Sequence, residues 1–344
     1  MKTIIVDSGR SLVKPLCGEL NKDLVFPAAV APGHTLSTDV QANSPLDLHL
    51  VVHHRPEDPA LELSREVFVG EFAIRQKGAM AVTDRSRDKA NPTNRILLAA
   101  AMSLFTNPFE EVHLVTNCPV RDWARQKDSL ARILKGTYRV QHLRGMFARP
   151  RPTVKEFKVV ECTILPEGPA ALYGYVYDRF GRERHPEVAA GITAVLDIGD
   201  QTCNVTVLED MDYRDEECFT LDLGLHHAHA KLLRWLEERC EGCNLTLPKL
   251  GRLLAKGETT YTQGGRVYFL KTERDRRYEE LADAIWNELQ ARFSGTPDHV
   301  LLVGGGALAL GEFLRARIRG SKVVWDAENS LWLTALGMDV MMKL

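Results

Sequence analysis

The sequence predicts an α/β protein built from two similar lobes. Its 344 residues exceed what one hydrophobic core usually holds, so two domains, or two lobes that share one cleft, are expected. Short apolar strands alternate with helical segments in both halves of the chain. Each half opens with an apolar strand that ends in Asp-x-Gly, first at Asp7 and again at Asp197. A repeated plan of this kind indicates two duplicated lobes that face each other.

In the first half, short apolar runs predict strands, and Asn91 followed by Pro92 is typical of a helix start. An amphipathic pattern predicts a second helix that Gly136 closes, and Glu167 lies in the first turn of a third. The predicted strands are 4–7, 47–52, 66–74, 111–117 and 154–166, and the helices begin at 92, 120 and 167.

The second half repeats the alternation and predicts strands at 192–200, 203–210, 217–224, 299–303 and 322–326. Its predicted helices cover 226–239, 276–293, the segment after Gly306 through Arg317, and 330–343. We therefore expect lobe I over 1–182 and lobe II over 183–327, with a hinge near 181–190. The C-terminal helix, within 328–344, is expected to pack back on lobe I.

Composition excludes several classes of function. A net charge of −2 and a pI near 6.6 give no electrostatic footprint for DNA, so no direct nucleic-acid ligand is expected. The basic segment 144–158 is interpreted as a solvated hairpin, with a partner surface as the alternative. No run of eighteen apolar residues exists and the first residues lack a secretory pattern, so we expect a cytoplasmic protein with no membrane contact. The seven cysteines are expected to be reduced thiols.

The first candidate phosphate site follows the first strand. Gly9 lets backbone N–H groups approach a phosphate, because it has no side chain in the way. Ser11 can donate a hydroxyl, Lys14 can place a positive charge on the β- or γ-phosphate, and Arg10 lies between them. Asp7 could hold waters around Mg²⁺. Taken alone, the segment could equally be a hairpin turn with a surface lysine.

Two further signals lie in the second half. The loop Gly199, Asp200, Gln201 and Thr202 follows Asp197 and repeats the logic of the first loop, although an ordinary turn would have the same pattern. The glycine run that begins at Gly304 stands between a strand and a helix, where a base and ribose can lie close to the backbone. This run comprises Gly304, Gly305, Gly306 and Ala307. Two Asp-x-Gly turns followed by a late glycine run form the order that a two-lobed nucleotide cleft requires.

In this order of motifs the sequence resembles the actin superfamily, and within it the bacterial plasmid-segregation ParM/StbA group. Further segments resemble that group in the same order, and the similarity runs from residue 3 to the C-terminus. The resemblance implies an actin-like (ribonuclease H-like) fold with a nucleotide cleft. The segments are 68–76, 114–136, 159–176 and 298–310.

Several roles are implied by the resemblance. It implies phosphate contacts in both loops, a nucleoside pocket at Gly304 to Ala307, and Mg²⁺ organised through water by Asp7 and Asp197. Glu167 matches the acidic position that orients the attacking water, a role that suits phosphoryl transfer. A first-turn carboxylate that stabilises a helix dipole is the alternative for Glu167.

The resemblance implies an ATPase, with GTP as the alternative substrate, that polymerises into dynamic filaments. Its partners would be further copies of itself and an adaptor of the ParR type bound to centromere-like DNA, and its role would be plasmid segregation. A non-polymerising nucleotide switch and a small-molecule kinase of the same superfamily remain the alternatives. Cys240 and Cys243, downstream of His226, His227 and His229, could suggest zinc, but a helix end with incidental thiols is the preferred interpretation.

Overall fold

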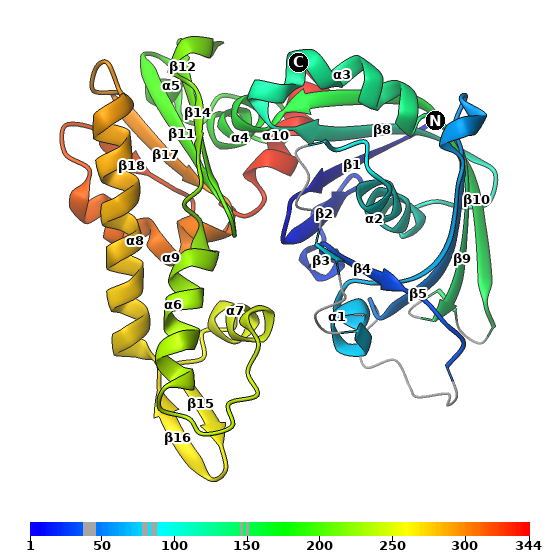
Figure 1. The fold of residues 1–344 in the computed structure, drawn as a ribbon. Coiled ribbons are helices and arrows are strands. Elements are labelled where there is room, and N and C mark those ends of the chain that lie inside the picture. Colours follow the sequence, from blue (N-terminus) through cyan, green and yellow to red (C-terminus); the bar gives the residue numbers. More distant parts are fainter. Residues whose placement is uncertain (37–45, 78–81, 84–87, 145–146, 149–150) are drawn as a thin grey trace. The chain divides into compact units, whose positions relative to one another are not determined.

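The computed structural model describes residues 1–36, 46–77, 82–83, 88–144, 147–148 and 151–344 (Figure 1). It divides into two compact units. Unit 1 comprises Met1–Arg182 and Thr334–Leu344, and unit 2 comprises Glu183–Leu333. The chain therefore leaves unit 1 inside the segment interpreted as a hinge and returns to it in the last helix.

Among its described residues, unit 1 contains a ten-stranded sheet of order β3-β2-β1-β8-β10-β9-β5-β6-β4-β7. The three central strands β1, β8 and β10 are parallel, whereas β2 and β9 pair with them in antiparallel fashion. The strands are β1 Lys2–Ser8, β2 Leu12–Leu16, β3 Phe26–Pro27, β4 Ala29–Pro32, β5 Leu48–Arg55, β6 Leu63–Val69, β7 Val82–Thr83, β8 Glu110–Cys118, β9 Gly136–Arg144 and β10 Thr153–Pro166.

Helices cover both faces of this sheet because side chains alternate along each buried strand. Ile4 and Val6 of β1 belong to the main core with α2, which lies inside the curve of the sheet, whereas Ile5 packs on the other face with α4 and α10 (Figure 1). The helices of unit 1 are α1 Glu71–Lys77, α2 Pro92–Ser103, α3 Val120–Leu134, α4 Glu167–Val176 and α10 Leu333–Met341.

Local signals explain where two of these elements begin and end. The side chain of Asn91 accepts a hydrogen bond from the Asn94 N–H and Pro92 is the first residue of α2, which confirms the predicted start. The predicted strand 66–74 is wrong in its second half. Gly70 has φ of +68°, which ends β6, and residues 71–74 form the first turn of α1 instead.

The basic segment 144–158 belongs to the β9–β10 hairpin, in which Thr153 pairs with His142. Residues 145–146 and 149–150 of this segment lie outside the described residues. Lys155 donates a hydrogen bond to the carbonyl of Thr106 at 2.6 Å, so at least this lysine is tied to the body of unit 1.

Within its own residues, unit 2 contains a six-stranded sheet of order β13-β12-β11-β17-β18, with β14 paired to β12. Helices α6, α8 and α9 contribute to one core with β11, β12 and β17. The elements are α5 Pro186–Ala189, β11 Ile192–Ile198, β12 Cys203–Glu209, β13 Asp212–Tyr213, β14 Phe219–Leu221, α6 Leu225–Glu237, α7 Leu247–Ala255, β15 Thr260–Gln263, β16 Arg266–Phe269, α8 Lys271–Arg292, β17 His299–Val303, α9 Gly305–Arg317 and β18 Lys322–Val324.

Unit 2 has a small second core. It lies where α6 and α8 are farthest from the sheet of this unit (Figure 1). Leu232 and Leu236 of α6, Leu250 and Leu254 of α7, and Cys240 form it beside the β15–β16 hairpin. All seven cysteines are free thiols. In the part of the chain that the structure describes, no helix combines the length and the apolar character that crossing a membrane requires.

Candidate functional site

The first predicted phosphate loop is the turn of the β1–β2 hairpin. Asp7 lies opposite Lys14 across the hairpin, and the Gly9 N–H donates to the carbonyl of Leu12 at 3.0 Å. The ammonium of Lys14 forms an ion pair with the carboxylate of Asp7, and both residues are buried. Thus the base of the loop holds a desolvated pair of opposite charges. Beyond it, Arg10 is half-buried and Ser11 is exposed.

Asn117 lies beside Asp7 because β8 runs parallel to β1, with Val6 opposite Thr116. Its Nδ2 donates to Asp7 Oδ1 at 2.7 Å. Its Oδ1 is buried and has no hydrogen-bond partner among the described residues. A buried carbonyl oxygen without a donor is uncommon, because it gives up a hydrogen bond to water. The pair of oxygen-bearing side chains suits a hydrated hard cation such as Mg²⁺.

Glu167 lies at the same edge of the sheet. Pro166, the last residue of β10, is opposite Cys118 of β8, so the carboxyl ends of three parallel strands meet there. In open α/β sheets this edge is where ligands bind. Glu167 Oε1 is 3.8 Å from the Nζ of Lys89, and both side chains are largely buried. Burial, and then the charge of Glu167, raise the pKa of the Cys118 thiol to about 12, while Lys89 lowers it.

The second predicted phosphate loop is the turn of the β11–β12 hairpin in unit 2. Ile198 lies opposite Cys203, and the Gly199 N–H donates to the carbonyl of Thr202 at 2.9 Å. Helix α6 begins directly against this loop, since the His226 N–H donates to the carbonyl of Asp200 at 2.7 Å. The backbone of the loop is thereby fixed on two sides. Gln201 is half-buried at its tip.

The glycine run packs against the strand that carries Asp197. Gly304 has φ of +82°, and a methyl group there would lie 2.5 Å from Asp197 Oδ1. A methyl group at Gly306 would lie 2.2 Å from the Cγ2 of Ile198. Gly305 is exposed at the start of α9, and Ala307 is buried. Unit 2 therefore brings the second loop, Asp197 and the glycine run together. Glycine at 304 and 306 allows the start of α9 to lie this close to β11.

Gly304→Ala is expected to disturb Asp197 and to weaken nucleotide binding about tenfold, which is about 1.4 kcal/mol. The methyl group must displace either the Asp197 carboxylate or the carbonyl of Ile198, 2.8 Å away. Gly257→Ala is the matched control, because Gly257 has φ of +79° and no atom within 4 Å of the added methyl. Titration with a fluorescent ATP analogue measures both variants, and equal affinities would show that the glycine run lies outside the binding site.

The alternative of a zinc site finds no support in unit 2. Within the described residues, no group of three or more His, Cys, Asp and Glu side chains is arranged to hold a metal ion directly. Cys240 is buried in the second core of unit 2. His229 donates or accepts a hydrogen bond with the Tyr278 hydroxyl at 3.0 Å, and burial lowers its pKa to about 4.

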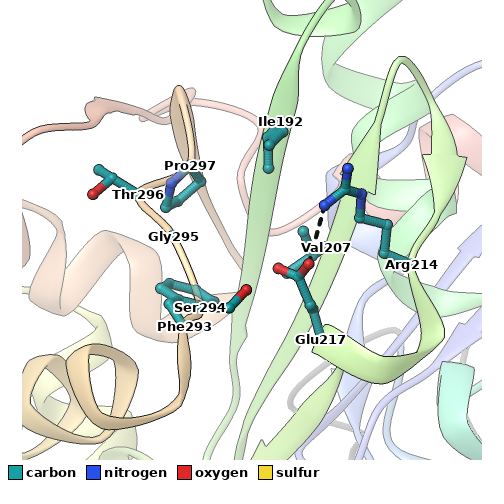
Figure 2. A pocket seen from close by; sticks show the side chains of 9 residues that line it. All are labelled: Ile192, Val207, Arg214, Glu217, Phe293, Ser294, Gly295, Thr296 and Pro297. Atoms are coloured by element: carbon teal, nitrogen blue, oxygen red, sulfur yellow. Dashed lines mark hydrogen bonds and ion pairs between the residues drawn. The ribbon is translucent and has the colours of Figure 1, made fainter.

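A small pocket of about 60 Å³, open to solvent, lies at the other end of β11 (Figure 2). Ile192, the first residue of this strand, lines it, whereas Gly199 follows the last residue. Arg214 and Glu217 lie on the same side of the pocket and form an ion pair at 3.0 Å (Figure 2). Because its charges are paired and it contains none of the predicted site residues, we do not assign it to the nucleotide.

Sequence reasoning did not identify Asn117 and Lys89. Asn117 closes the segment interpreted as a strand, and Lys89 precedes the Asn91-Pro92 helix start. Neither residue belongs to a sequence motif that would indicate a functional site. Only the order of parallel strands, which places β8 between β1 and β10, brings Asn117 beside Asp7.

Two family models match the chain. The model described as actin like proteins N terminal domain matches residues 6–169, and the model described as archaeal actin homologue MreB-like, C-terminal, matches residues 195–316. A comparison with curated proteins gave no match. The two matched regions lie in unit 1 and unit 2 respectively.

Solved structures share the fold across the whole chain. Ta0583, an archaeal actin homologue in complex with ADP, is 17% identical with a TM-score of 0.75, covering 100% of this chain and 99% of that one. A ParM from a 15-stranded filament of Clostridium botulinum is 18% identical, with a TM-score of 0.73 and 99% of each chain covered. Bacillus thuringiensis ParM with AMPPNP is 16% identical, with a TM-score of 0.73 and 99% and 98% covered. The fold expected from the sequence is thus confirmed.

Proposed function

We propose that this chain, which two models of actin-like proteins match and which shares the fold of actin homologues, binds Mg·ATP, hydrolyses it and assembles into filaments. The observation that carries the proposal is the same hairpin in both units. Each hairpin places an aspartate, Asp7 or Asp197, at the end of its first strand, and a glycine N–H, of Gly9 or Gly199, closes the turn. In each unit the first strand is parallel to a later one. In each unit, a tight glycine turn of this kind suits a nucleotide phosphate.

In unit 1, Asp7 and Asn117 offer buried oxygen atoms that fit a magnesium ion held through water. In unit 2, Asp197 is half-buried beside Gly304. A bound Mg²⁺ would neutralise phosphate charge during phosphoryl transfer. Lys14 would turn from Asp7 to a phosphate, and Glu167 would orient the attacking water.

The proposed cellular role is movement of plasmid copies through an adaptor protein. The net charge of −2 supports indirect contact with DNA, since a protein that binds the phosphate backbone directly needs a basic surface. Two of the similar structures are ParM proteins, one of them in a filament. GTP is retained as the alternative substrate.

Sedimentation of the purified protein with Mg·ATP, Mg·GTP, Mg·ADP or no nucleotide tests the proposal, together with phosphate release from the same samples. We expect pelleting with a triphosphate only, followed by disassembly as phosphate is released. Phosphate release from protein that stays in the supernatant at high concentration would favour a nucleotide switch. Transfer of phosphate to an added sugar or acid would favour a kinase.

A further inference from the structure

Lys89 carries a buried ammonium group that the proposed chemistry does not yet use. The residue is 7% exposed and precedes α2. Its Nζ donates to the carbonyl of Ser8 and lies 3.8 Å from Glu167 Oε1. A lysine removed from water is costly unless its charge is compensated. Lys89 therefore has a specific place between the first phosphate loop and Glu167.

The backbone around Lys89 is held to the same loop. Asn94 Nδ2 donates to the carbonyl of Lys89 at 2.7 Å, and the Ser8 hydroxyl donates to Asn94 Oδ1 at 2.5 Å. Asn94 itself is fixed by the cap of α2, where its N–H donates to the Asn91 side chain at 2.9 Å. Ser8, Lys89 and Asn94 thus form a closed ring of hydrogen bonds that ties the backbone of Lys89 to the first phosphate loop.

The contact with Ser8 fixes one peptide group at the start of the loop. The Ser8 carbonyl accepts from Lys89, and the N–H of the same peptide, on Gly9, donates to the carbonyl of Leu12. Both polar ends of this peptide are thus satisfied, which fixes the plane in which the following N–H groups can meet a phosphate. The ammonium of Lys14, by contrast, pairs with Asp7.

We propose that Lys89 is a positioning residue that holds the Glu167 carboxylate and the Ser8–Gly9 peptide in one arrangement. The proposal rests on the proposed hydrolysis at this site. Lys89 acts through Glu167 and through the loop, so removing it misplaces the water-orienting carboxylate while most nucleotide contacts remain. The effect is on kcat more than on nucleotide affinity.

Lys89→Met is expected to lower single-turnover phosphate release about 100-fold, the size of effect that a misplacement near 1 Å produces. Affinity for a fluorescent ATP analogue should change less than about threefold, or about 0.7 kcal/mol. Lys89→Arg, which keeps the charge, should recover part of the rate. Lys155→Met is the control, because Lys155, like Lys89, donates to a main-chain carbonyl, but it is half-buried and lies outside the site.

A double variant that combines Lys89→Met with Glu167→Gln distinguishes positioning of Glu167 from an independent structural role of Lys89. Because Lys89 acts partly through Glu167 and partly through the loop, the rate loss of the double variant should be smaller than the product of the two single losses but larger than the loss in Glu167→Gln alone. A wild-type rate in Lys89→Met, or fully additive rate losses, would overturn the proposal.

If the wild-type protein binds nucleotide but releases no phosphate, the proposed hydrolysis fails, and the coupling itself is still measured. Urea unfolding of the two single variants and the double variant then gives a double-mutant cycle. Additive effects on the free energy of unfolding would show that Lys89 and Glu167 are not coupled, which would overturn the proposal. Non-additive effects would show that the two residues are coupled even though the protein does not hydrolyse nucleotide.

Discussion

Glu167→Gln is expected to slow phosphate release about 10²- to 10⁴-fold, the range for a positioned general base or orienting carboxylate. The substitution keeps the shape and the capacity to donate and accept hydrogen bonds, but it removes the negative charge. Glu167 is the first residue of α4, directly after β10, and its side chain is 13% exposed. Because a largely buried carboxylate at this sheet edge has few alternative positions, little of its function should be recovered by movement.

Single-turnover phosphate release from Mg·ATP measures the effect, and sedimentation of the same samples follows assembly. Polymer that forms with ATP and then persists in Glu167→Gln would connect disassembly to hydrolysis at this residue. Glu161→Gln is the matched control, since Glu161 lies on β10 with a side chain that is 52% exposed. If Glu167→Gln releases phosphate at the wild-type rate, Glu167 is instead a first-turn carboxylate that stabilises α4 by about 0.3–1 kcal/mol.

The sequence was sufficient for five of the ten described strands in the sheet of unit 1, for five of the six in the sheet of unit 2 and for the repeated hairpin turns, because these depend on local signals. Apolar runs mark β1, β8 and β11, and an asparagine followed by proline marks the start of α2. The segment 71–74 was misassigned because its alternating apolar residues fit a strand, whereas Gly70 ends that strand. The short strands β15 and β16 and helix α7 were not predicted, since their apolar residues contact α6 and not a larger core.

The two hairpin turns could be predicted from the sequence, but the residues that contact the first turn from distant parts of the chain could not. Glycines and aspartates at fixed spacing predict a tight turn of the backbone. The contacts of Asn117 and Lys89 with the first hairpin form only when strands and helices from distant parts of the chain meet. Asn117 is 110 residues from Asp7 and Lys89 is 81 residues from Ser8. A single sequence contains no signal for such pairs, because each residue type is ordinary in its own local context.

Gly337→Ala is expected to cause the largest loss of stability, about 3 kcal/mol or more, beyond the usual effect of overpacking. The added methyl group would lie 1.6 Å from the carbonyl oxygen of Ala170 and 2.7 Å from the backbone nitrogen of Gly174. Both neighbours are backbone atoms of α4, which cannot rotate away as a side chain can. Helix α10 would have to move off α4 and would lose the burial of Met338 against Ile5.

Urea or thermal unfolding followed by circular dichroism measures this loss. Gly295→Ala is the control, since a methyl group there has no atom within 4 Å and the backbone has no positive φ. Because α4 begins with Glu167, any Gly337→Ala protein that remains folded should also release phosphate more slowly, although neither phosphate loop is changed. Wild-type stability in Gly337→Ala would mean that α10 does not pack this closely on α4, and the helix that presents Glu167 would then need another support.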